Sequence, residues 1–80
     1  MKLPRDLSGS DLIRQLAKLG YVVTRQAGSH VRLTTQERGE HHVTVPEHDQ
    51  LRIGTLASIL AVVAAHHGIS RYELLMRLLG

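Results

Sequence analysis

Two short segments with alternating apolar and polar residues constrain the fold more than any other feature. Residues 30–35 read His-Val-Arg-Leu-Thr-Thr and residues 41–45 read His-His-Val-Thr-Val, with a polar loop around Gly39 between them. A period of two is typical of a strand that buries one face. Pairing Thr35 with His41 gathers four apolar side chains on one face, namely Val31, Leu33, Val43 and Val45. The two segments are therefore predicted to form an antiparallel hairpin.

A third strand is predicted at residues 21–25, where β-branched residues are frequent. Two connections to the hairpin are chemically plausible. A three-residue loop at 27–29 pairs Gln26 with His30 and keeps the apolar side chains of the new strand on the buried face, Tyr21 and Val23. A two-residue turn at 28–29 reverses the facing of one strand. We predict the three-residue loop because it preserves a single apolar face.

Helices are predicted on both sides of these strands. Ser8, followed three residues later by Asp11, is an acidic form of the capping box, and it starts a helix at 9–19 that Gly20 ends. A second helix is predicted at 53–67, with Thr55 as an alternative cap near its start. Ser70 and Glu73 form a further capping box, which starts a third short helix.

The predicted order is α-β-β-β-α-α, an α+β fold with a three-stranded antiparallel sheet and helices on one face. A chain of 80 residues is expected to form one domain, residues 1–80. It contains no cysteine, which excludes disulfides and thiolate metal sites. No apolar run follows the N-terminal charges, and the apolar stretch at 56–65 is too short to span a bilayer. We expect a soluble cytoplasmic protein without a membrane segment.

The solvent-facing side of the predicted sheet is polar and basic. It carries Thr24, Gln26, His30, Arg32, Thr34, His42 and Thr44. The formal charge is +3 with histidines neutral, and arginine supplies most of the excess. Arginine forms forked contacts with phosphate, so this face favours a nucleic-acid partner. Tyr21 and Tyr72 are the only aromatic residues apart from histidine, which argues against base-stacking recognition.

Several short motifs stand in order along nearly the whole chain. They include Lys2-Leu3-Pro4-Arg5, Ser8-Gly9, Leu19-Gly20-Tyr21, Gly28-Ser29-His30, Val43-Thr44-Val45-Pro46, His48, Gly54-Thr55-Leu56 and Gly68-Ile69-Ser70. In their order and spacing these motifs resemble the HicA toxins of HicA–HicB toxin–antitoxin pairs. The resemblance implies a fold like that of double-stranded-RNA-binding domains, an mRNA-cleaving activity, and a HicB-like antitoxin that covers the His30 face. The chain departs from the family at Ala27, often basic there, and at Val31, often a second histidine.

His30 occupies the position of the key histidine in that family. Imidazole titrates near neutrality, so it can accept the proton of an RNA 2′-hydroxyl, which then attacks the adjacent phosphorus. This route needs no metal or other cofactor. His42, on the same predicted face, is a candidate acid partner, although a solvated polar residue is the commoner outcome. His48 is a candidate for a structural hydrogen bond in the loop after the third strand.

Further RNA contacts are predicted around His30. Arg32 shares its face, Arg25 is expected to lean toward the other side, and Lys2 is expected to come near in space. Gly28 and Ser29 form a turn whose backbone amides and hydroxyl can cradle a phosphate.

Histidine pairs do not indicate a metal site here, because the adjacent residues 41–42 and 66–67 lack chelating spacing. Two alternatives to an endoribonuclease remain. One is a non-catalytic RNA-binding module, and the other is an interaction protein that docks through its long apolar second helix.

Overall fold

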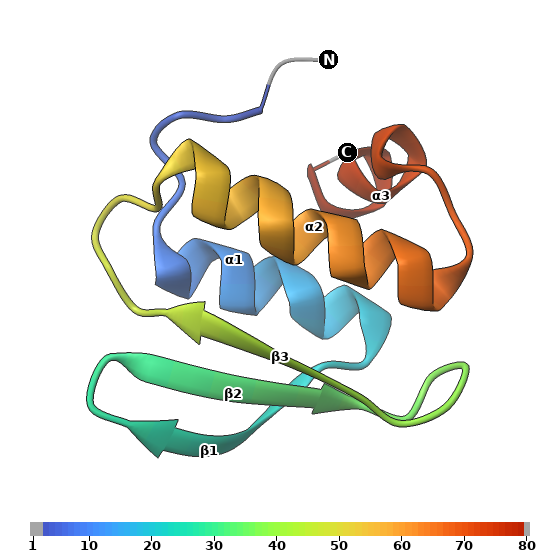
Figure 1. Ribbon diagram of the computed structural model, residues 1–80, viewed down its shortest axis with the longest axis horizontal. Helices are drawn as coiled ribbons and strands as arrows, with labels where there is room; N and C mark the ends of the chain where they lie inside the picture. Colours follow the sequence, from blue (N-terminus) through green and yellow to red (C-terminus); the bar gives the residue numbers. More distant parts are fainter. Residues whose placement is uncertain (1–2, 80) are drawn as a thin grey trace.

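A computed structural model of the chain describes residues 3–79 (Figure 1). Its elements are α1 (Gly9–Leu16), the 3-10 turn η1 (Ala17–Leu19), β1 (Val22–Ala27), β2 (His30–Thr35), β3 (His41–Pro46), α2 (Ile53–His67) and α3 (Arg71–Leu79). The predicted α-β-β-β-α-α order and the α+β class are confirmed.

The first helix begins at Gly9 as predicted, but its α-helical part ends at Leu16, and residues 17–19 of the predicted helix form the 3-10 turn η1. The amide of Asp11 donates to the Ser8 hydroxyl over 3.0 Å, and the Ser8 amide donates to the Asp11 carboxylate over 3.2 Å. This reciprocal capping box satisfies two amides that lack helical partners. After η1, Gly20 adopts a left-handed conformation with φ of 80° and ends the segment.

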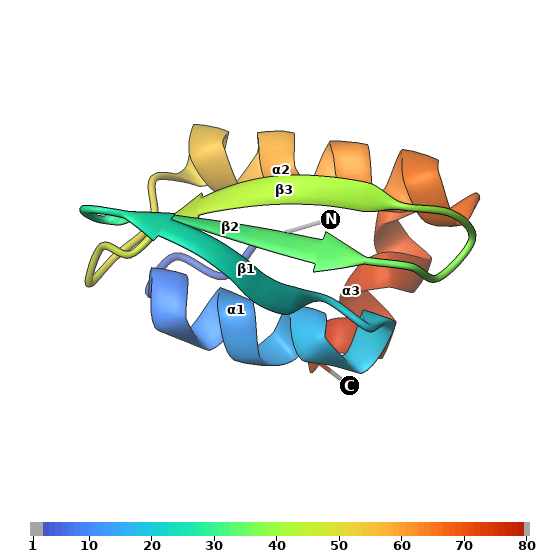
Figure 2. The same ribbon diagram turned by 90° about the horizontal axis from the view of Figure 1, so that it is seen from below.

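The sheet has the strand order β1-β2-β3 and is antiparallel throughout. Thr35 pairs with His41 and Leu33 with Val43, so the predicted register of this hairpin is confirmed. Helices α1 and α2 lie on the same face of the sheet (Figures 1 and 2). No described helix covers the opposite face, which we call the open face (Figure 2). The buried side chains of β2 and β3 pack with both helices in one core.

The connection between β1 and β2 differs from the prediction. Ala27 pairs directly with His30, so the turn has two residues and the predicted three-residue loop is wrong. Gly28, with φ of 59°, occupies the first central position, where type II′ turns take glycine. A bulge between Val23 and Arg25 adds one residue to β1, which restores Val23 to a position opposite Leu33.

The two-residue turn reverses two expectations about facing. Directly opposed residues in an antiparallel pair place their side chains on the same face. Arg25 opposes Arg32 and therefore belongs to the open face, whereas Gln26 opposes Val31 and belongs to the helix-covered side. Val23 remains 52% exposed because β1 is the edge strand, and all six of its residues are exposed. Tyr21, just before β1, is buried as predicted.

Helices α2 and α3 complete the core. Helix α2 begins at Ile53 as predicted, but its N-cap is Arg52 without a side-chain hydrogen bond, so Thr55 is not the cap. Its apolar C-terminal half contributes Val63 and Ala64 to the core, beside α3. No single described helix is long and apolar enough to cross a membrane; α2 and α3 reach that length only together, and they are bent by 101°.

Candidate nucleic-acid interface

His30 is the first residue of β2 and follows the turn directly. It is exposed, and its strand neighbours are Ala27 on β1 and Pro46 on β3. Among residues 3–79, no side chain or backbone group forms a hydrogen bond with its ring. Its ring nitrogens therefore have no hydrogen-bond partner among the described residues, so an incoming ligand meets no competing contact from them.

The turn that carries His30 is tied to the segment after β3. The Gln26 side-chain amide donates to the Gly28 carbonyl and to a Glu47 carboxylate oxygen, each over 3.1 Å. The Glu47 amide donates to the Ser29 carbonyl over 2.6 Å. We call Gln26 and Glu47 the turn clamp. The sequence pattern does not indicate the turn clamp, because Glu47 is distant in the chain and the pattern predicts Gln26 on the opposite face.

Two arginines lie side by side in register on the open face. Arg25 opposes Arg32 on one side, and Thr44 opposes Arg32 on the other. Neither guanidinium forms an ion pair with a described acidic residue, whereas Arg14 pairs with Asp11 and Arg77 with Glu73. Arg32 is two residues from His30, a distance of about 7 Å along the strand. The open face thus presents two uncompensated positive charges near His30.

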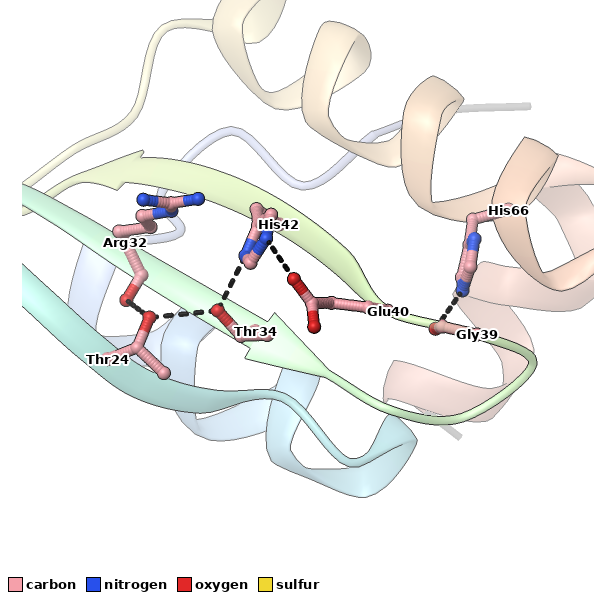
Figure 3. A network of polar contacts seen from close by, with 7 residues as sticks. All are labelled: Thr24, Arg32, Thr34, Gly39, Glu40, His42 and His66. Atoms are coloured by element: carbon pink, nitrogen blue, oxygen red, sulfur yellow. Dashed lines mark hydrogen bonds and ion pairs between the residues drawn. The ribbon is translucent and has the colours of Figure 1, made fainter.

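His42 belongs to a separate polar network at the other end of the open face (Figure 3). Its Nδ1 lies 2.7 Å from the Thr34 hydroxyl, and its Nε2 lies 2.9 Å from a Glu40 carboxylate oxygen. The Thr34 hydroxyl in turn contacts that of Thr24 over 2.8 Å. His42 opposes Thr34, four residues from His30, which separates the two histidines by about 13 Å. They share a face, but His42 is out of reach of an atom held at His30.

The remaining predicted residues have different outcomes. His48 contributes its backbone carbonyl, which accepts a 2.9 Å hydrogen bond from the Gly9 amide, while its side chain is exposed. Gly28 and Ser29 form the turn itself. Lys2 lies outside the described residues. Within the described range, no three histidine, aspartate or glutamate side chains come together as a metal-binding group.

The fold and this interface define a small α+β domain with an open, basic sheet face. The family model of the HicA toxin of bacterial toxin–antitoxin systems matches residues 9–64. That match spans more than half of the chain, and the chain belongs to the HicA toxin family. The matched range contains the turn, His30 and both open-face arginines. Comparisons with curated proteins and with solved structures give no match.

Proposed function

We propose that this protein is an endoribonuclease toxin that cleaves mRNA and thereby stops translation and growth. Membership of a family whose members are generally RNases supports this activity. The single observation that carries it in this chain is the placement of His30. Its ring is exposed and unbonded among the described residues, at the end of a face that also carries Arg25 and Arg32.

In the proposed reaction the RNA supplies the nucleophile. A ring nitrogen of His30 accepts the proton of a 2′-hydroxyl, and that oxygen forms a bond to the adjacent phosphorus. The bond from phosphorus to the 5′-oxygen breaks, and water supplies the proton that the leaving oxygen takes up. The products are a 2′,3′-cyclic phosphate and a 5′-hydroxyl end. This route uses no metal ion, and water is assigned the acid step because His42 lies about 13 Å from His30.

The basic residues have a binding and electrostatic role in this proposal. Arg32 and Arg25 hold phosphates of the strand and stabilise the charge that develops on the reacting phosphoryl group. Gly28 and Ser29 bring the turn close to the backbone of the RNA, and His42 and Lys2 extend the contact. Recognition through phosphates fits a chain with only two tyrosines and no other large aromatic residue.

The proposed partner is a HicB-like antitoxin, since membership of this toxin–antitoxin family implies an antitoxin. We place the antitoxin over the open face, where it covers His30 and keeps RNA away. We also propose that the toxin acts in the cytoplasm, where its mRNA substrate is found.

A cleavage assay tests the proposal. Antitoxin-free protein in excess EDTA is incubated with a long mRNA, beside His30→Ala and the control His48→Ala, whose side chain is also exposed. Cutting by the wild type and by His48→Ala, but not by His30→Ala, is the expected result. Equal cutting by all three proteins would contradict the role of His30.

A second candidate function is a non-catalytic RNA-binding module. Two observations favour it: Ala27, where the family is often basic, stands directly opposite His30, and no second described histidine lies beside His30. This function predicts RNA binding by the wild type and by His30→Ala alike, with no cleavage by either. The assay above, together with a binding measurement on the same proteins, separates the two functions.

A further inference from the structure

Four aromatic rings meet at the edge of the core, far from the turn that carries His30. They belong to Tyr21, which precedes β1, His41 at the start of β3, and His66 and His67 at the end of α2. We call these four residues the histidine cluster. His41 and His66 stack with ring centroids 4.3 Å apart and planes 8° from parallel. His67 is buried and meets both Tyr21 and His66 edge to face.

The Tyr21 hydroxyl links two of these imidazoles. It lies 2.8 Å from Nδ1 of His41 and 3.2 Å from Nε2 of His67. A phenol has one proton, so it donates to one nitrogen and accepts from the other. Neutral histidines satisfy both contacts, because one presents a lone pair and the other an N–H. If both imidazoles were protonated, both would present an N–H group to the Tyr21 oxygen. Neither ring would then offer a lone pair to accept the phenol proton.

His66 ties the cluster to the turn between β2 and β3. Its Nε2 donates to the Glu37 carbonyl over 2.8 Å and to the Gly39 carbonyl over 3.1 Å, and the second contact is drawn in Figure 3. Arg38 and Gly39 both have positive φ, 56° and 98°. A residue such as arginine rarely adopts this conformation and needs surrounding contacts to hold it. The imidazole of His66 therefore fastens a conformationally demanding turn to the C-terminal end of α2.

The surroundings of the cluster disfavour added positive charge. Burial, and then the neighbouring His66, lower the pKa of both His41 and His67, and His67 and His42 lower that of His41 further. Glu37 opposes this effect on the pKa of His67, while Arg38 and Arg77 add to it. Burial also raises the pKa of Tyr21 to about 12, so the phenol stays neutral. Glu37 and Arg38 face the cluster from the β2–β3 turn, His42 from β3 and Arg77 from α3, and His66 lies on α2 within the cluster.

We propose that the histidine cluster is an acid-sensitive latch. While its imidazoles are neutral, it holds the β2–β3 turn and the start of β3 against the end of α2. Protonation places positive charges on stacked and hydrogen-bonded rings, which separates them and releases the turn. The latch acts on the fold of the toxin and lies apart from the proposed RNA-cleaving residues, so it does not rest on the proposed function.

The direction of the pH effect follows from proton binding. In the unfolded chain histidine has its ordinary pKa of 6.5, whereas His41 and His67 bind protons only at lower pH in the fold. The latch is therefore fully effective above about pH 6.5 and loses its contribution as the pH falls from there toward the folded-state pKa values. In that pH range, unfolding is expected to be accompanied by the uptake of about two protons, one each at His41 and His67. The unfolding free energy should therefore fall with decreasing pH with the slope that two protons give.

The test is chemical unfolding between pH 8 and pH 5 on the full chain. The cluster variants are His41→Gln and His67→Gln, and the matched controls are His30→Gln and His48→Gln, whose side chains are exposed. Each cluster variant is expected to reduce the proton uptake by about one, and the controls are expected to keep the wild-type value. An uptake that is the same in both cluster variants and in the wild type would overturn the proposal.

Two measurements on the wild type keep the test decisive if a cluster variant does not fold. The histidine ring signals in NMR spectra report each titration separately; midpoints for His41 and His67 below those of His30 and His48 support the latch, and equal or higher midpoints overturn it.

Amide hydrogen exchange measures how firmly the β2–β3 turn is held. Protection of the Gly39 amide, which donates to the Gln36 carbonyl over 3.2 Å, is expected to fall by a larger factor on acidification than protection within β2. An equal change at both places would overturn the release of the turn.

Discussion

Arg25 lies directly opposite Arg32 across β1 and β2, and neither guanidinium has an acidic partner among residues 3–79. Opposed like charges on a sheet are destabilising. Their pairing therefore adds nothing to the stability of the fold and leaves both charges available to a polyanion.

Replacing either arginine by glutamine should weaken RNA binding without lowering stability. Each phosphate contact that is lost is expected to reduce the slope of log affinity against log salt by about 0.7 for single-stranded RNA. The measurement is a salt titration of binding for Arg25→Gln and Arg32→Gln, with thermal unfolding of the same samples. Arg71→Gln, an exposed arginine on α3, is the control and should leave the slope unchanged. Slopes equal to that of the wild type in both open-face variants would contradict the assigned binding surface.

The turn clamp should affect the rate of cleavage more than binding. Glu47→Ala removes one of the two acceptors of the Gln26 side-chain amide, the one that ties the turn to the segment after β3, so the turn and His30 are held less firmly. Because small displacements of a catalytic group are costly, kcat is expected to fall on the order of 10-fold, with KM little changed.

The conservative variant Glu47→Gln keeps an oxygen acceptor and should restore most of kcat. Single-turnover cleavage kinetics measure both variants against the wild type. Equal losses in Glu47→Ala and Glu47→Gln would show that the carboxylate charge matters rather than the hydrogen bond to Gln26.

The parts of the fold that burial dictates were predictable from the sequence. The β2–β3 register follows from Val31, Leu33, Val43 and Val45, because a slip of one residue would turn the two apolar side chains of one strand away from the core. Strand β1 lacks this constraint, since all six of its residues are exposed and its alternation therefore carries little information. The two-residue turn changes the facing of Arg25 and Gln26 from the prediction. The bulge at Thr24, which has no sequence signature of its own, returns Val23 to the position opposite Leu33.

The candidate interface was predicted in part for the same reason. His30 and Arg32 belong to a strand whose other face is buried, so their place on the open face follows from the pattern; His30 is exposed and Arg32 is half-buried. The turn clamp and the histidine cluster join residues far apart in the sequence, such as Tyr21 and His67, through side-chain geometry. The hydrophobic periodicity of the sequence does not reveal such contacts. From the sequence, the adjacent histidines at 66–67 bear only on metal binding. Their contacts in the histidine cluster depend on α2 ending beside β3 (Figure 1).

The capping box of α1 predicts a second pH dependence of stability. The hydrogen bonds that Asp11 forms with the backbone and side chain of Ser8 hold the pKa of this carboxyl below its ordinary value of 3.8. A lowered carboxyl pKa gives stability that is present above the unfolded value and is lost as the pH falls through the folded value. Asp11→Asn should therefore destabilise the protein at pH 7 and have little effect near pH 2, as measured by urea unfolding. A difference between the two proteins that persists at pH 2 would point to packing rather than charge.

Replacement by alanine is expected to have opposite effects on stability at two helical glycines. A Cβ on Gly9 would lie 2.1 Å from the Pro46 carbonyl oxygen, because α1 begins against the end of β3. Gly9→Ala must push these backbones apart, and such overpacking typically costs about 1–3 kcal/mol. Nothing lies within 4 Å of a Cβ on Gly54, in the first turn of α2. Gly54→Ala should stabilise the protein by about 0.5–1 kcal/mol, since alanine loses less backbone freedom on folding.

Chemical unfolding at pH 7.5 measures both glycine variants against the wild type. Because β3 ends beside the turn through the hydrogen bond from Glu47 to Ser29, a shift at Gly9 is also transmitted toward His30. Gly9→Ala is therefore expected to lower RNA cleavage at a temperature where the variant is still fully folded, whereas Gly54→Ala keeps wild-type activity. A Gly9→Ala protein as stable as the wild type would mean that α1 does not begin against Pro46.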